Sequence, residues 1–267
     1  MADHLYYVYA VVPPEIAIEA APSGIDGRGV ELIAESDVAA LVSRVDDATY
    51  GSGVDEHIAD VAWLAPRATA HDTVLTWASD LGAVVPLPLL SLFRSEHAVQ
   101  AMLAERRDEL RRLLENVARG REYGVRVFRV DDELRQALSS FSASIAALEA
   151  DVSSASSPGQ SYLLGRKLEA ARKDELHRVA SDVANAAYHE LAAHALAATQ
   201  DALPKATADQ TGAAVLNASF LVAHGRVDEF RAAVTGLVRD YNGRGFRLEF
   251  TGPWPPYHFA RSATNVG

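Results

Sequence analysis

The sequence predicts an α+β fold of two domains, each ferredoxin-like (split βαβ) or a modified version of it. Three observations support this. The 267 residues are 49% hydrophobic and 23% charged, which is typical of a globular chain with a buried core. The length is sufficient for two domains. Strand-like and helix-like segments alternate within two halves of similar size, which favours mostly antiparallel sheets covered by helices.

The first predicted domain is residues 1–120. Its opening segment is rich in Tyr and Val and is followed by two prolines, as at the end of a strand. A Ser-Asp turn then separates two short β-branched segments, which predicts a hairpin. A helix interrupted at Pro66, an edge or bent strand containing prolines, and a second helix capped by Ser95 follow. The expected elements are residues 5–12, 30–34, 38–43, 58–81, 84–93 and 95–119.

The second predicted domain is residues 121–250. A Ser-rich stretch at 152–160, with Pro158 and Gly159, predicts a loop. The helical pattern at 161–202 is long for a globular protein, so it predicts either two helices or an antiparallel projecting arm. The expected elements are a strand at 123–130, helices at 131–151 and 161–202, a strand at 213–223, a helix at 227–241 and a strand at 246–250.

Residues 251–267 form a predicted extended tail. Four aromatic residues and three prolines fall within residues 250–259. Proline has no N–H to donate, so we expect this stretch to leave the sheet and to display its rings from a stiff backbone. Two roles stay open, an inter-domain clamp and a partner-docking strip. The candidate residues are Trp254, Pro255, Pro256, Tyr257 and Phe259.

Charge and composition exclude several classes of protein. The formal net charge is −11, which argues against nucleic acid as a partner because phosphate binding depends on Lys and Arg. The chain has no cysteine, so disulfides and thiol catalysis are excluded. No basic leader precedes the first apolar run, and segment 81–93 is too short to span a bilayer. We therefore expect a cytoplasmic protein with no lipid-membrane partner.

No motif predicts a catalytic residue, a cofactor or a metal. His189 and His194 lie five residues apart, whereas a zincin helix needs histidines at i and i+4. The loop beginning Gly51-Ser-Gly has Glu56 where a dinucleotide-binding loop needs its third glycine. We therefore expect no enzymatic activity. Two alternatives stay open, an enzyme with an acidic site near residues 46–57 and a scaffold that uses 161–202 as a coiled arm.

Four places in the chain carry a family resemblance. They are YYVYAVV at 6–12, His71 with VVPLPL at 84–89, PGQSYL at 158–163 with Lys167, and NASFLV at 217–222 with TGPWPPYHF at 251–259. Together they resemble the gas vesicle accessory protein family that groups the F and L proteins (GvpF/GvpL). The resemblance covers nearly the whole chain, and its last motif is the specific one. One departure is Pro88-Leu89-Leu90, where the family usually has Arg-Phe-Gly.

The resemblance implies an assembly factor or minor structural protein without known enzymatic activity. Its partners would be the small, very hydrophobic shell protein (GvpA-type) and other gas vesicle accessory proteins. Its location would be the cytoplasm and the gas vesicle, where one family member is reported at the gas-facing surface. A soluble acidic partner could cover the apolar faces and strand edges of shell subunits before assembly. The resemblance does not separate an F role from an L role.

Overall fold

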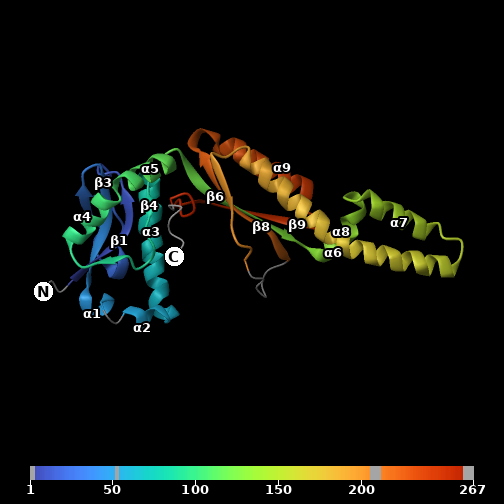
Figure 1. Cartoon of the computed structure of the whole chain (residues 1–267), viewed down its shortest axis with the longest axis horizontal. Helices are drawn as coiled ribbons and strands as arrows, with labels where there is room; N and C mark the ends of the chain where they lie inside the picture. The colour runs from blue at the N-terminus through green and yellow to red at the C-terminus, as the bar shows by residue number, and fades with distance from the viewer. Residues whose placement is uncertain (1–3, 52–53, 205–211, 261–267) are drawn as a thin grey trace. The chain divides into compact units, whose positions relative to one another are not determined.

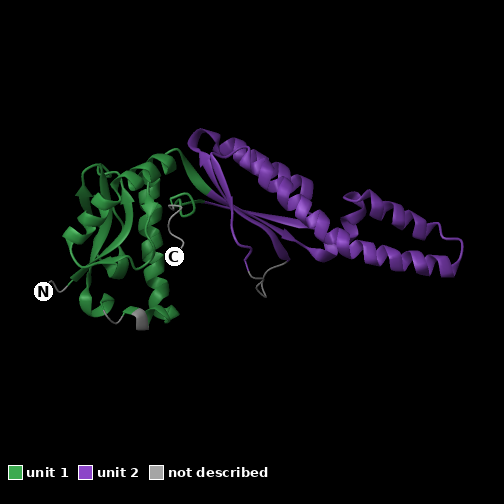
Figure 2. Cartoon of the chain, in the orientation of Figure 1, with its two compact units in different colours: residues 1–122, 253–267 green, residues 123–252 purple. Residues whose placement is uncertain are grey.

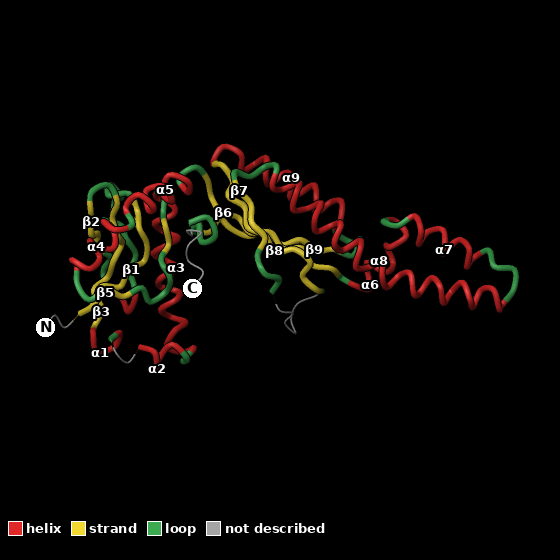
Figure 3. The backbone as a smooth tube through the Cα atoms, viewed as in Figure 1, coloured by secondary structure: helices red, strands yellow, loops and turns green. Residues whose placement is uncertain are grey.

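The computed structural model describes residues 4–51, 54–204 and 212–260 (Figure 1). The chain divides into two compact units (Figure 2). Unit 1 is Met1–Glu122 together with Pro253–Gly267, and unit 2 is Tyr123–Gly252. Each unit has its own sheet and helices (Figure 3), so the predicted α+β class is confirmed.

Unit 1 is built around a sheet with the strand order β2-β3-β1-β4, in which β5 also pairs with β1. The strands are β1 (His4–Val12), β2 (Glu31–Glu35), β3 (Val38–Asp46), β4 (Val85–Pro86) and β5 (Leu92–Phe93). The helices are η1 (Ile25–Gly27), α1 (Asp47–Tyr50), α2 (Val54–Ile58), α3 (Val61–Leu81), α4 (Glu96–Glu105) and α5 (Arg107–Val117). The predicted hairpin is β2–β3, paired antiparallel from Glu31↔Val42 to Glu35↔Val38.

Strand β1 is buried on both faces, which explains its uninterrupted apolar sequence. Tyr7 and Tyr9 belong to a core cluster that includes Val74 and Leu75 of α3. Tyr6 and Val8 belong to a second cluster, with residues of α4 and α5. Side chains of a strand alternate between its faces, so β1 supplies both clusters at once. A register shift against β3 between Val8 and Ala10 then places Tyr9 and Ala10 in the same cluster.

Unit 2 is built around a sheet with the strand order β7-β8-β6-β9. Its strands are β6 (Gly120–Arg129), β7 (Ala197–Gln200), β8 (Ala213–Ala223) and β9 (Phe246–Trp254). Its helices are α6 (Asp131–Ala137), η2 (Leu138–Ser140), α7 (Ala143–Ser153), α8 (Pro158–Ala192), η3 (His224–Arg226) and α9 (Val227–Tyr241). The order β, α, β, β, α, β is the ferredoxin-like pattern, with α6 to α8 as the first connection. Unit 1 has the same order of its first four strands but no long helix between β1 and β2.

The long helix is α8, a single helix of 35 residues whose first half forms a hairpin with α7 (Figure 1). Ser157 caps it by accepting from the Gln160 N–H, and Pro158 occupies its first turn. Arg172 joins the two helices of the hairpin through a salt bridge to Glu149 at 2.9 Å. The predicted projecting arm is therefore the α7–α8 hairpin, and the second half of α8 contributes Val179, Val183 and neighbouring residues to the core of unit 2.

Several predicted boundaries are wrong. The long helix ends at Ala192, and Ala197–Gln200 forms β7 because it pairs with β8. The predicted helix 131–151 is three pieces, α6, η2 and α7. Pro66 does not interrupt α3, whose buried face continues through Val74, Leu75 and Ala78 and offsets the lost hydrogen bond. The predicted strand 84–93 is two short strands, β4 and β5, both paired with β1.

The expectation that the proline-rich tail leaves the sheet at residue 250 is also wrong. Strand β9 continues through Pro253 to Trp254. It is an edge strand, paired with β6 on one side, and an edge position tolerates a residue without an N–H. Within the residues that the structure describes, no helix is both long enough and apolar enough to cross a membrane.

Candidate functional site

The candidate site lies in unit 1 and is centred on the C-terminal segment, defined here as residues 253–260. After Trp254 the backbone leaves the strand and turns: the Tyr257 N–H donates to the Pro255 carbonyl at 2.7 Å, and the Ala260 N–H donates to the Pro256 carbonyl at 2.9 Å. Pro255 and Pro256 are buried. Because proline fixes φ, the two residues hold the direction of the segment as it enters the turn.

The segment is fixed to unit 1 by two carboxylates. The Tyr257 hydroxyl donates to Asp72 Oδ1 at 2.6 Å, and burial followed by that carboxylate raises the pKa of Tyr257 above its ordinary value. The His258 backbone N–H donates to Glu122 Oε2 at 3.0 Å, and His258 Nδ1 lies 2.5 Å from Glu122 Oε1. The Glu122 side chain is only 2% exposed, so the His258 contacts compensate a desolvated acid.

Apolar contacts of the segment reach both cores of unit 1. Tyr257 packs against the cluster that contains Tyr7 and Tyr9. Phe259 and Ala260 pack against the cluster that contains Tyr6 and Val8. Of the five residues singled out in the sequence, Pro255, Pro256, Tyr257 and Phe259 are thus at least partly buried in unit 1, whereas Trp254 is 44% exposed.

A cavity of about 610 Å³ lies against the segment within unit 1. It is lined by Ala68, His71, Asp72, Val85, Pro86, Leu87, Pro88, Leu89, Arg106, Leu110, Tyr257 and Ala260. Its volume is within the range of small-ligand sites, and its polar groups are few and lie among apolar and proline side chains. Two separate stretches of sequence that contain paired or closely spaced prolines, near 86 and near 255, therefore meet at one place.

A buried hydrogen-bond network supports the wall of this cavity. The Tyr7 hydroxyl lies 2.7 Å from His71 Nδ1 and accepts from the Leu90 N–H at 3.3 Å. His71 is 6% exposed, and burial lowers its pKa to about 4. The imidazole is therefore neutral near pH 7, and Tyr7 donates to its Nδ1. Leu90 has a φ of +66°, a left-handed conformation that costs a leucine about 1–2 kcal/mol.

Replacing Tyr7 with phenylalanine is expected to destabilise the chain by about 1–3 kcal/mol. The change leaves the His71 Nδ1 and the Leu90 N–H without the hydroxyl, and a buried polar group without a partner costs about that much. Urea unfolding measures the loss. Tyr6→Phe is the matched control, because Tyr6 is a buried tyrosine of the same strand (7% exposed) whose hydroxyl has no hydrogen bond among the described residues. Equal effects of the two substitutions would contradict the network.

The structure does not bring together the other groups that were considered in the sequence. Asp46 pairs with Arg28 at 2.6 Å rather than facing a second carboxylate. His194 lies 3.7 Å from Glu190 on the same helix. Within residues 4–51, 54–204 and 212–260, no group of three or more His, Asp or Glu residues could hold a metal ion. What the sequence did not reveal was His71 as a buried partner of Tyr7, a pairing of residues 64 positions apart.

Comparison with known proteins identifies the family. The model of the family described as "Gas vesicle synthesis protein GvpL/GvpF" matches residues 5–261. Gas vesicle protein L of Streptomyces sp. (strain CB03234) is 30% identical over 265 residues, covering 97% of this chain and 93% of that protein. Gas vesicle protein F of Haloferax mediterranei is 44% identical over 45 residues, covering 17% of this chain and 21% of that protein.

Two crystal structures share the fold. Gas vesicle protein GvpF from Anabaena sp. PCC7120 matches with a TM-score of 0.67 and 18% identity, over 97% of both chains. GvpF from Microcystis aeruginosa gives the same TM-score and identity, over 98% of this chain and 100% of that one. The fold and the family match extend over the same nearly complete length. This chain therefore belongs to the gas vesicle GvpL/GvpF family and is a protein of gas vesicle formation.

Proposed function

We propose that this protein is an assembly factor or minor structural component that binds the hydrophobic shell subunit of the gas vesicle. The exposure of the Trp254 ring is the observation in the structure that supports the proposal. Trp254 is 44% exposed and lies near the start of the C-terminal segment, which is held by two buried prolines and two carboxylates. A large aromatic ring on a fixed backbone loses little entropy on binding, and tryptophan is enriched where binding energy concentrates.

The electrostatics fit the same role. The formal net charge of −11 keeps the protein dispersed, while a shell subunit is very hydrophobic and aggregates through its apolar faces. We propose that binding takes place in the cytoplasm and that the protein stays with the gas vesicle, on the gas-facing side of the shell. Other accessory proteins of the vesicle are the second class of proposed partner. No enzymatic step is part of the proposal.

Trp254→Ala is expected to weaken binding to purified shell protein by at least about 30-fold, the effect of a residue that contributes about 2 kcal/mol to an interface. Stability should change little, because the ring is already partly in water. Co-purification and a titration of tagged protein against shell protein measure binding, and urea unfolding measures stability.

Two controls separate the alternatives. Tyr162→Ala removes a ring that is 64% exposed on α8, in the α7–α8 hairpin. Retained binding with Tyr162→Ala supports the role of Trp254, whereas lost binding with this variant alone favours a scaffold that uses the hairpin. The proposal fails if the unmodified protein binds neither the shell protein nor another vesicle component. Immunoblots of washed vesicles test whether the protein remains in them.

A further inference from the structure

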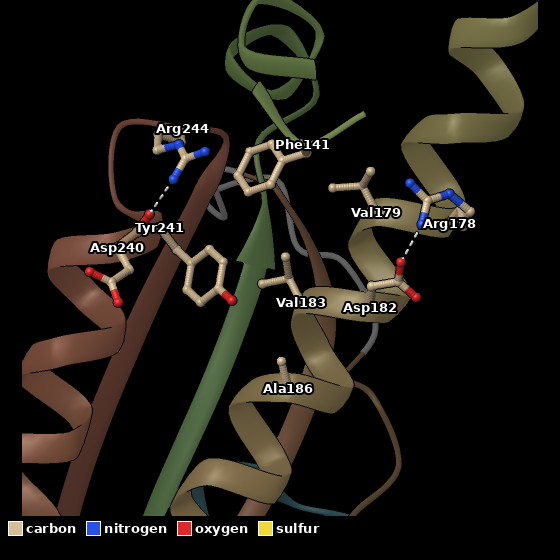
Figure 4. Close-up of a pocket in the computed structure, with 9 residues that line it drawn as sticks. All are labelled: Phe141, Arg178, Val179, Asp182, Val183, Ala186, Asp240, Tyr241 and Arg244. Atoms are coloured by element: carbon tan, nitrogen blue, oxygen red, sulfur yellow. Dashed lines mark hydrogen bonds and ion pairs between the residues drawn. The ribbon is translucent and has the colours of Figure 1, made fainter. Parts of the chain in front are cut away.

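Unit 2 contains a second cavity, separate from the C-terminal segment, which we call the α8–α9 groove (Figure 4). Its volume is about 450 Å³. It lies between the second half of α8, the last turn of α9 and the turn that leads into β9, with Phe141 at one end. The lining residues are Phe141, Arg178, Val179, Asp182, Val183, Ala186, Asp240, Tyr241 and Arg244.

The floor of the groove is apolar. Val179 and Val183 are buried residues of the unit 2 core, and the small Ala186 leaves space beside them. The Phe141 and Tyr241 rings are nearly parallel, with centroids 6.4 Å apart and an interplanar angle of 14°. The Tyr241 hydroxyl has no hydrogen-bond partner among residues 4–51, 54–204 and 212–260. An apolar side chain could therefore lie on this floor beside a polar group that can still donate.

Most charges at the rim are already compensated. Arg178 forms salt bridges with Glu175 and Asp182. Asp240 pairs with Arg239 at 3.0 Å. These three salt bridges give Arg178, Asp182 and Asp240 each a partner of opposite charge.

Arg244 differs from the other rim charges because its partners among the described residues are neutral. Its guanidinium donates to the Asp240 backbone carbonyl at 3.1 Å and to the Ser140 hydroxyl at 3.0 Å. It lies 4.2 Å from the centroid of the Phe141 ring. These contacts explain how the side chain is held at the end of α9, but they use only two of its five N–H donors. Within the described part of the chain, no carboxylate forms a salt bridge with it.

We propose that the α8–α9 groove binds a protein segment that presents an apolar side chain next to a carboxylate. The apolar side chain lies on Val179, Val183 and the Tyr241 ring. The carboxylate pairs with the uncommitted N–H groups of Arg244. The carboxylate complements the charge of Arg244. The guanidinium is already oriented by Phe141 and Ser140, so pairing requires little further ordering, and a charge-assisted bond to Arg is among the strong ones. This site is independent of Trp254 and goes beyond the function proposed above.

The test uses the full chain and two peptides, acetyl-Leu-Phe-Glu-Leu-amide and the same peptide with Gln in place of Glu. Binding is followed by two-dimensional NMR of the isotope-labelled protein. The Glu peptide should shift the resonances of Gly243, Gly245 and the Arg244 side chain, and it should bind about 10-fold more tightly than the Gln peptide. Equal affinity for the two peptides, or shifts confined to other parts of the protein, overturns the proposal.

Variants separate recognition from folding. Arg244→Gln should abolish the preference for the Glu peptide, and Arg244→Lys should keep part of it. Ala186→Phe, on an exposed position of α8, should fill the groove and weaken both peptides without removing the Arg244 contact to the Asp240 carbonyl. Arg231→Gln, an exposed arginine on the same α9, is the matched control and should change neither affinity. An Arg244→Gln protein that still prefers the Glu peptide contradicts the assignment.

Discussion

Replacing His258 with alanine is expected to lower the free energy of unfolding by about 1–3 kcal/mol, the usual cost of leaving a buried polar group without one of its partners. The reason is Glu122, whose side chain is 2% exposed and whose two oxygens are contacted by the His258 ring and backbone N–H. Without the imidazole, the carboxylate keeps one backbone donor and loses its ring partner. Urea unfolding monitored by circular dichroism measures the loss.

A double variant tests this explanation directly. Glu122→Gln removes the charge that His258 compensates, so adding it to His258→Ala should restore a large part of the lost stability. His97→Ala, on an exposed position of α4, should change stability by no more than about 0.5 kcal/mol. If the double variant is as unstable as the sum of the single variants, the loss does not arise from an unpaired Glu122.

His258→Ala should also release the C-terminal segment locally. The segment would keep the bond from Tyr257 to Asp72 and the backbone N–H bond of residue 258 to Glu122, but it would lose the ring contact to Glu122. Amide hydrogen exchange should therefore accelerate at Tyr257 and Ala260, whose N–H groups bond within the turn. Exchange in the β8 core of unit 2 serves as the internal reference. Faster exchange throughout the protein, rather than in the segment, would indicate general unfolding instead.

The elements that were predicted from the sequence are those with a strong local pattern. The run of Tyr and Val in β1 and the β-branched pair β2–β3 are examples, and their burial on pairing follows from their composition. The C-terminal boundary of α8 could not be predicted from a local sequence pattern. Residues 193–202 are rich in alanine, which favours helix, and only pairing with Ala218–Leu221 of β8 makes 197–200 a strand.

Only part of the candidate site was predicted, because its composition is a local feature and its contacts are not. The density of prolines and aromatic rings marked residues 254–259 as unusual without any structure. Their partners could not be inferred, because Tyr257 and Asp72 lie 185 positions apart and His258 and Glu122 lie 136 positions apart. A single sequence carries no signal for contacts at such separation. Pro253 misled the prediction because proline excludes a central strand but not an edge strand.

His71 is expected to make the protein sensitive to acid, with a loss of about 3 kcal/mol between pH 6.5 and pH 4. Burial lowers the pKa of His71 from its ordinary 6.5 to about 4 in the folded protein. In that interval the unfolded chain binds a proton at this residue and the folded chain does not. Stability from this group is therefore fully present above pH 6.5 and is lost as the pH falls towards 4. Each pKa unit corresponds to about 1.4 kcal/mol, which sets the magnitude.

Two measurements check the acid effect. The free energies of unfolding of the unmodified protein and of His71→Gln are measured by urea unfolding between pH 4 and pH 7. The difference between the two proteins at each pH gives the contribution of His71 to the pH dependence of stability. The unmodified protein should lose more stability on acidification, because Tyr7 and Tyr9 surround the imidazole and the attraction of Asp72 is weaker than the cost of burying its charge. NMR titration of the His71 ring should show it neutral down to about pH 4. A midpoint near 6.5 would mean that water reaches the ring, and the predicted difference between the two proteins would then vanish.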